Sequence, residues 1–398
     1  RDYEIAIKTN KCIKPHHFVD ISARSMNVNV KRDSNGNYLD YYTGQITHDK
    51  YGKSVTMKTL LARGVAAGEW VIVLDPENEY EGLVRYLGGQ YMEIKSGEFS
   101  GLNPFELDVE DDGKEQEINI YGKLSEIREM VSMFCEKFRE DPLHGREITT
   151  VEEIVKSLYA KRGITKDPRS LYREAHEEID GQFYTGRIKK EMPTLSELQD
   201  ELSQIEWTEE LSEILKILTE GNSLSMFDGQ TEIDVGSRLI GINLKNLTDE
   251  FMKFFATVNI LSWIWSKFSN WQYKNFKKRV VIDEGWLFAR YPHAATFLEE
   301  IARRGRKYRI SLVIASQMIN EFLANDSGKA VINQCATKFV MKQDPAVARQ
   351  VSDYLLLSSN CREMMSNFTP GQGILLTDTD TTLMQITPFD FEWEYIRT

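Results

Sequence analysis

The stretch from residue 278 to residue 317 constrains the fold of this chain more than any other part of the sequence. It holds two apolar runs, at 280–282 and 310–315, separated by a helix-like segment that ends in ARRGRKY. Two further apolar runs stand at 70–74 (WVIVL) and 238–244 (RLIGINL). Such runs, alternating with helical patterns, are typical of strands buried on both faces of a parallel sheet. We therefore predict an α/β fold with a mostly parallel sheet and helices on both faces.

Polar residues follow these strands, and parallel strands bring their carboxyl ends to one edge of the sheet, where ligands bind. Asp283 and Glu284 follow one run, and Ser316 and Gln317 follow the next. We predict that Asp283 holds Mg²⁺, that Glu284 polarises an attacking water, and that Gln317 contacts a γ-phosphate or the water. Glu77, just after WVIVL, is a further candidate to act on the water or on Mg²⁺. The plainer alternative is that these residues only cap or turn the chain.

A candidate phosphate-binding turn, Gly52-Lys53-Ser54 followed by Val55, opens a predicted helix. A phosphate loop uses glycine amides to close around a phosphate, a lysine to reach the β- and γ-phosphates, and a hydroxyl to hold Mg²⁺. In the pattern GxxxxGKS the first glycine would stand at Thr47. Either the loop is degenerate or residues between Thr47 and Gly52 are missing from this sequence, and we favour the second explanation.

Basic residues form two clusters. The helix-like segment ends in Arg303, Arg304 and Arg306. Basic residues are favoured at a helix C-terminus because of the helix dipole, which is the plainer explanation. Alternatively, one of the three acts as an arginine finger on the nucleotide of a neighbouring subunit. The run at 274–279, next to Trp271, fits a solvated loop better than a nucleic-acid contact, although such a contact stays open. The net charge of −12 argues against a surface that coats nucleic acid indiscriminately.

The sequence divides into three parts. Residues 1–45 show short strand-like pieces that suit the edge of a domain, and residues 46–105 and 236–398 carry the α/β pattern. Residues 106–235 are charged and helical in period, and we predict an all-helical insertion there. The most apolar segment, at 254–268, is too short to cross a bilayer, so we expect a buried helix.

Several motifs together resemble one family. The motifs DPENEY at 75–80, VVIDE at 280–284, ARRGRKY with ASQ at 315–317, and PGQGILL at 370–376 are similar to those of conjugative type IV secretion ATPases. These ATPases form the TraC/TraE-like class within the FtsK/HerA group of P-loop motors. The resemblance runs from about residue 53 to residue 398, and it is to the C-terminal ATPase domain. It implies a RecA-like P-loop NTPase core with an all-α inserted subdomain.

The same resemblance implies site roles and a cellular setting. Lys53 and Ser54 would bind phosphate and Mg²⁺, Asp283 and Glu284 would form the acidic pair, and Gln317 would be the sensor. The protein would bind ATP and Mg²⁺ and assemble as a hexamer or a lower-order ring. It would lie in the cytoplasm, peripheral to the inner face of the cell membrane, with a secretion channel and coupling proteins as partners.

We therefore expect an ATP hydrolase that powers transfer of DNA or protein, or pilus assembly. A HerA/FtsK-like motor that translocates along DNA is the first alternative. A nucleotide-gated scaffold that hydrolyses little ATP is the second.

Overall fold

The computed structural model describes residues 52–111, 116–179, 182–219, 221–232, 237–270, 273–285, 298–299, 301–317, 319–324 and 326–396. The strand-rich segment predicted at 1–45 and the loop residues from Thr47 to Tyr51 lie outside these ranges. The same holds for Trp271.

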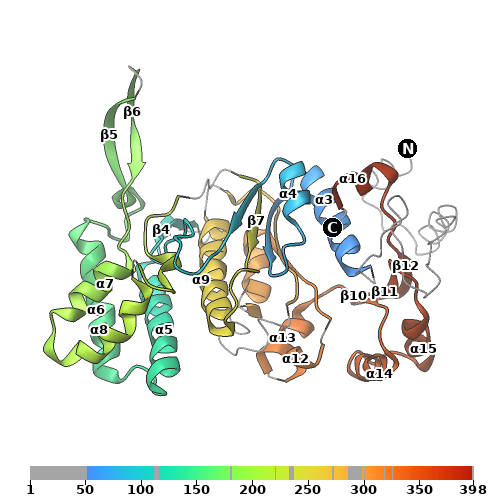
Figure 1. The fold of residues 1–398 in the computed structure, drawn as a ribbon. Coiled ribbons are helices and arrows are strands. Elements are labelled where there is room, and N and C mark those ends of the chain that lie inside the picture. The colour runs from blue at the N-terminus through green and yellow to red at the C-terminus, as the bar shows by residue number, and fades with distance from the viewer. Residues whose placement is uncertain are drawn as a thin grey trace.

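A parallel sheet of five strands, in the order β2-β7-β1-β8-β9, forms the centre of the fold (Figure 1). Four of its strands, β7, β1, β8 and β9, coincide with the four apolar runs of the sequence, which confirms the predicted α/β fold. The fifth, β2, lies at an edge and is only partly buried, so its residues lack an apolar run. The strands are β1 (Trp70–Asp75), β2 (Gln90–Glu93), β7 (Leu239–Asn243), β8 (Lys278–Ile282) and β9 (Ile310–Ile314).

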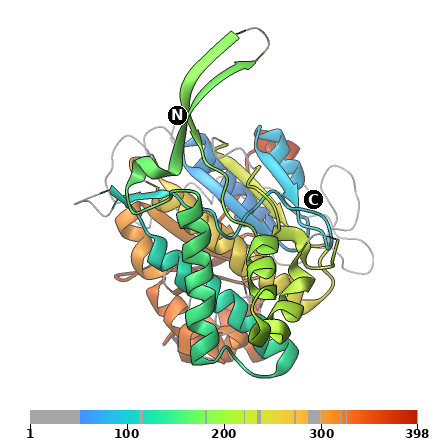
Figure 2. The same cartoon turned by 90° about the vertical axis from the view of Figure 1, so that its left-hand side faces the viewer.

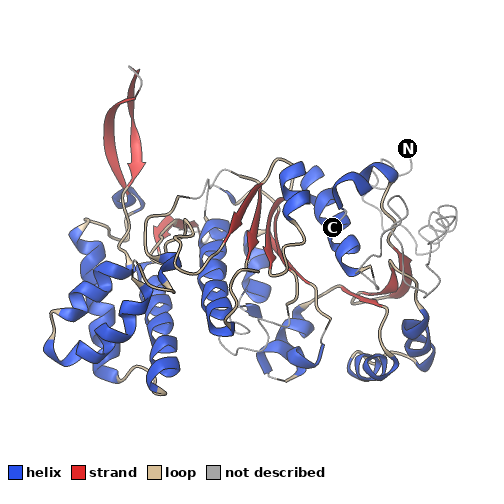
Figure 3. Ribbon diagram, in the orientation of Figure 1, coloured by secondary structure: helices blue, strands red, loops and turns tan. Residues whose placement is uncertain are grey.

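Side chains alternate between the two faces of the sheet, and each face has its own helices (Figure 3). Val71 and Val73 of β1 pack in one apolar cluster with residues of α3 (Lys53–Ala66), α4 (Glu81–Tyr86) and α16 (Trp393–Ile396). Ile72 and Leu74 belong to a second cluster with α9 (Glu250–Ser269). The helix α9 is the predicted buried helix. Across the described residues, no helix combines the length and the apolar character needed to span a membrane.

The segment between β2 and β7 is not all-helical, so that prediction was wrong. It contains helices, but it also forms two antiparallel hairpins, and the longer one projects away from the rest of the molecule (Figures 1 and 2). The helices are α5 (Ile120–Arg139), α6 (Gly145–Lys161), α7 (Leu195–Ser203) and α8 (Glu209–Leu215). The strands are β3 (Val109–Asp111), β4 (Gln116–Ile118), β5 (Tyr172–Ile179) and β6 (Gln182–Lys189).

The physical reason for this error is the composition of the longer hairpin. β5 and β6 pair only with each other, so neither needs the apolar run of a buried strand. The remaining sequence signal was the dipeptide Asp180-Gly181 between them, which is typical of two-residue hairpin connections. Within the same segment, Thr194 and Glu197 form a capping box at the start of α7.

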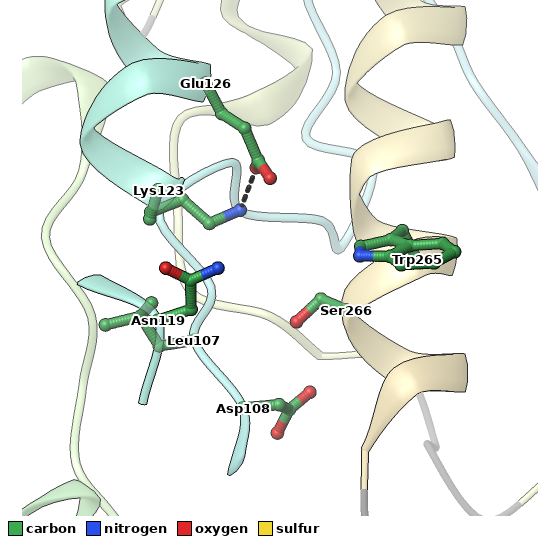
Figure 4. A pocket seen from close by; sticks show the side chains of 7 residues that line it. All are labelled: Leu107, Asp108, Asn119, Lys123, Glu126, Trp265 and Ser266. Atoms are coloured by element: carbon green, nitrogen blue, oxygen red, sulfur yellow. Dashed lines mark hydrogen bonds and ion pairs between the residues drawn. The ribbon is translucent and has the colours of Figure 1, made fainter. Parts of the chain in front are cut away.

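Helix α5 of this segment packs against α9 and so joins the segment to the central sheet. The ring of Phe134 in α5 lies 4.8 Å from the ring of Phe255 in α9, measured between centroids. Near this junction Lys123 of α5 pairs with Glu126 at 2.5 Å, and Ser262 of α9 donates a hydrogen bond to Glu126. A small polar pocket lies here and contains none of the predicted site residues (Figure 4). It is lined by Leu107, Asp108, Asn119, Lys123, Glu126, Trp265 and Ser266.

The C-terminal part forms a separate antiparallel sheet in the order β10-β11-β12. β11 and β12 pair antiparallel and form a hairpin across residues 377–380. The strands are β10 (Lys338–Met341), β11 (Gln372–Leu376) and β12 (Thr381–Gln385). The helices of this part are α12 (Ile319–Leu323), α13 (Asp326–Gln334), α14 (Pro345–Tyr354) and α15 (Ser359–Asn367).

Candidate nucleotide-binding site

The predicted phosphate-binding turn forms the start of α3. Gly52 is the N-cap residue with φ 75°, a backbone conformation that favours glycine. A Cβ atom at Gly52 would also lie 2.7 Å from the backbone nitrogen of Gly371, so a side chain does not fit there. Lys53, Ser54 and Val55 occupy the first turn of the helix, and a helix N-terminus favours an anion through its backbone amides and its dipole.

Lys53 points to the acidic pair. Its Nζ donates to Asp283 Oδ1 at 2.7 Å and also to the Glu284 carboxylate. The three side chains are only 16%, 5% and 11% exposed, so little water screens them. Burial alone would lower the pKa of Lys53, but the charges and hydrogen bonds of Asp283 and Glu284 outweigh it and raise the pKa above its ordinary value. The two ends of the predicted site therefore meet.

The strand order explains how the acidic pair and Gln317 come together. β8 and β9 are parallel neighbours, so the residues that follow them lie side by side. Gln317 Nε2 donates to Glu284 Oε1 at 2.8 Å. Glu284 has φ 48°, and its own N–H donates to Asp283 Oδ1 at 2.9 Å, which closes a tight turn at the strand tip. A Cβ atom at Gly285 would collide with Ile314, so the turn needs glycine next.

The loop after β1 also reaches this edge, but through a residue that sequence reasoning missed. Tyr80 donates from its hydroxyl to Asp283 Oδ2 at 3.0 Å. Glu77, the residue that we had singled out in this loop, is exposed, and within the described part of the chain no interaction connects it to Lys53 or Asp283. The sequence placed Tyr80 in the motif DPENEY but gave no sign of a partner 203 positions away.

The three candidate arginines lie at the amino ends of the strands, opposite the carboxyl ends where Lys53 meets the acidic pair. The 3₁₀ turn η6 (Gly305–Tyr308), which holds Arg306, leads into the amino end of β9. A strand of five residues spans about 13 Å, so these side chains cannot serve the chain's own Lys53 cluster. Arg303 pairs with Glu299 at 2.7 Å, and Arg304 stacks over the Trp265 ring at 5.1 Å. Arg306 is exposed, and none of the described residues forms an ion pair with it.

The oxygen ligands at this edge suit Mg²⁺ in a nucleotide site. Mg²⁺ bound to nucleotides typically takes one or two protein oxygens and completes its shell with phosphate and water. Asp283 offers a carboxylate and Ser54 a hydroxyl in the same turn as Lys53. No group of three or more histidine, cysteine or acidic residues suited to a metal occurs among the described residues. The residues therefore fit a metal that is held jointly with the nucleotide.

Comparison with known proteins decides the family. The family described as the TraG P-loop domain matches residues 9–366 of the 398 residues. The chain belongs to the TraG P-loop domain family. This confirms the expected class, that of conjugative-transfer P-loop ATPases. No curated protein sequence matches the chain.

Solved structures agree with this family in their fold. VirB4 of Thermoanaerobacter pseudethanolicus superposes with a TM-score of 0.71 at 23% identity, over 92% of this chain and 97% of that chain. The plasmid coupling protein TrwB in complex with ADP and Mg²⁺ gives 0.54 at 11% identity, over 85% and 83%. TrwB with the ATP analogue ADPNP gives 0.52 at 11% identity, over 84% and 82%. At these identities the likeness is one of fold, and it confirms the P-loop NTPase architecture of this TraG-family chain.

Proposed function

We propose that this chain is the ATPase motor of a conjugation or type IV secretion system. It hydrolyses ATP with Mg²⁺ and uses the energy for transfer of DNA or protein, or for pilus assembly. The observation that carries this proposal is the ion cluster of Lys53 with Asp283 and Glu284, at the carboxyl edge of a P-loop sheet. The ammonium of Lys53 pairs with both carboxylates, and a bound triphosphate would compete with them for this cation.

Each residue of the cluster has a role in that reaction. Gly52 and the amides of Val55 and its neighbours receive the phosphates, and Lys53 moves to the β- and γ-phosphates. Ser54 and Asp283 would hold Mg²⁺, which would neutralise negative charge on the phosphates.

The remaining candidates act on the attacking water. Glu284 orients and polarises it, and the hydrogen bond to Gln317 holds the Glu284 carboxylate while Gln317 senses the γ-phosphate. Glu77 stays a secondary candidate, because its loop borders the site while its side chain faces solvent.

The arginine that completes the site comes from a neighbouring copy in a ring, a hexamer or a lower-order assembly. The position of Arg303, Arg304 and Arg306 at the far edge of the sheet supports a role in trans, since no subunit can use its own. Of the three we propose Arg306, because Arg303 and Arg304 already contact Glu299 and Trp265. An arginine finger contributes roughly 10³ to 10⁵ in rate.

The partners and location are proposed from the relatives. TrwB is a conjugative coupling protein, and we propose that this chain works beside a secretion channel and coupling proteins, peripheral to the cytoplasmic face of the membrane. DNA contact at residues 274–279 gains little support. Tyr273 and Phe276 pack on Trp70 with ring centroids 4.7 and 5.1 Å apart. Lys278 is buried and Arg279 pairs with Glu69 at 2.7 Å, so Lys274 and Lys277 are the two exposed basic residues of this run.

Replacement of Glu284 by Gln tests the proposal. The variant keeps the shape of the side chain, so we expect ATP binding within about twofold of wild type and turnover reduced by about 10² or more. Glu98→Gln, an equal change at an exposed glutamate, serves as the control. Unchanged turnover in Glu284→Gln would remove Glu284 from its role.

The same assay separates the alternatives. Strong stimulation of turnover by DNA, lost steeply as salt rises, would favour a DNA translocase. Absence of turnover in the wild-type protein with every partner added would favour a nucleotide-gated scaffold.

A further inference from the structure

Tyr80, which has no part in the proposed reaction, contacts Asp283, the carboxylate that we propose as a Mg²⁺ ligand. Tyr80 is completely buried, and its hydroxyl lies 3.0 Å from Asp283 Oδ2. It comes from the loop after β1, whereas Asp283 follows β8, the strand next to β1 in the sheet. The contact therefore joins two strand tips at the edge where the nucleotide would bind.

Tyr80 is itself held by a second buried carboxylate, Asp75 at the end of β1. Asp75 accepts the backbone N–H groups of Glu79 at 2.9 Å and Tyr80 at 2.8 Å. It also accepts the Tyr91 hydroxyl of β2 at 2.6 Å. The Nζ of Lys58 in α3 lies 5.6 Å from the centre of the Tyr80 ring. Backbone, ring and hydroxyl of Tyr80 are thus all fixed, and the phenol has one direction in which to donate.

The two carboxylate oxygens of Asp283 have different hydrogen-bond donors. Oδ2 accepts from Tyr80, while Oδ1 accepts from Lys53 and from the N–H of Glu284. When Lys53 leaves for a triphosphate, Oδ1 loses its ammonium but keeps the Glu284 N–H, and Oδ2 keeps the Tyr80 hydroxyl, so the carboxylate stays oriented by hydrogen bonds to both oxygens.

We propose that Tyr80 is a positioning residue that locks Asp283 with Oδ1 presented to the nucleotide-bound Mg²⁺. This inference rests on the proposed function, because it assigns Asp283 to the metal. Hydrogen-bond partners of metal-ligating carboxylates fix their orientation, and their removal typically costs about 10- to 100-fold in metal affinity.

The test compares Tyr80→Phe with Tyr159→Phe. Both residues are buried tyrosines that donate one hydrogen bond, but Tyr159 donates to the backbone oxygen of Phe105, in the segment between β2 and β7. Both changes remove one hydroxyl and keep the ring. ADP affinity is measured by equilibrium binding in saturating Mg²⁺ and in EDTA, and the ratio of the two dissociation constants gives the coupling between metal and nucleotide. Thermal unfolding of both variants checks the fold.

We expect the coupling ratio of Tyr80→Phe to fall about tenfold or more, with ADP affinity in EDTA within about twofold of wild type. Tyr159→Phe should keep the wild-type ratio. A Tyr80→Phe ratio equal to wild type would overturn the inference and leave the proposed function standing. Equal loss of ADP affinity with and without Mg²⁺ would also overturn it, because Tyr80 would then only support the fold. Wild-type protein that binds no ADP in either buffer would overturn the proposed function itself.

Discussion

Replacement of Lys53 by Met should destabilise the nucleotide-free protein, because it leaves two buried carboxylates without their cation. The Lys53 Nζ lies 2.7 Å from Asp283 Oδ1. At this separation, and with an effective dielectric constant of about 20, each pair attracts by about 6 kcal/mol before desolvation is counted. Loss of one partner from a buried pair costs about 3 to 5 kcal/mol in measured cases.

We place the expected loss near the lower end, at about 3 kcal/mol of unfolding free energy, since Lys53 retains 16% exposure. Urea unfolding without nucleotide, followed by tryptophan fluorescence, measures it. Lys95→Met is the matched control, because Lys95 also faces two glutamates, Glu93 at 3.3 Å and Glu98 at 3.6 Å, but on the exposed surface. We expect the control to keep the wild-type midpoint.

The double variant Lys53→Met/Glu284→Gln sharpens the test. With one carboxylate neutralised, the repulsion that Lys53→Met uncovers is smaller, so the double variant should lose at least about 1 kcal/mol less than the sum of the two single variants. The reasoning is refuted if Lys53→Met unfolds within about 0.5 kcal/mol of wild type, or if the two changes are additive.

Two further predictions concern the arginine and a buried lysine. The Arg306→Ala and Glu284→Gln proteins should each be nearly inactive alone. A mixture of the two should regain turnover, because a Glu284→Gln subunit can supply Arg306 to the intact site of an Arg306→Ala neighbour. A mixture as inactive as its parts would exclude a role of Arg306 in trans. Burial, and next the charge of Arg309, lower the pKa of Lys278 to about 8 from 10.5, so between these values the unfolded chain binds the extra proton and stability rises with pH. As the pH rises from 7 to 10, the unfolding free energy of wild type, measured in urea, should therefore rise by on the order of 2 kcal/mol relative to that of Lys278→Met. Parallel pH profiles of the two unfolding free energies would contradict this.

The sequence was sufficient for the core of the sheet because burial on both faces demands continuous apolar runs, as in the six buried residues of β1. The sequence was insufficient for strands that are not buried on both faces, because these do not require a continuous apolar run. β2 lies at an edge, and the β5–β6 hairpin pairs only with itself, so neither needed such a run. The charged character of the hairpin looked helical, although Asp180-Gly181 was a usable turn signal.

At the site, the sequence predicted the residues that lie at strand tips and at the start of α3. The structure brings Asp283, Glu284 and Gln317 together as predicted, because parallel neighbours bring their carboxyl ends together. The contact of Tyr80 with Asp283 could not be predicted, since the two residues are distant in sequence and a tyrosine ring suggests core packing. In the same loop the sequence favoured Glu77 for its charge, and only the fold shows that its side chain faces solvent.

A structure of the protein with ADPNP and Mg²⁺ tests the central claim most directly. We predict that the Lys53 ammonium leaves the carboxylates and contacts the β- and γ-phosphates, with Asp283 Oδ1 facing the metal and Oδ2 still accepting the hydrogen bond from Tyr80. A nucleotide bound elsewhere on the fold, with Lys53 still paired to Asp283 and Glu284, would contradict the account.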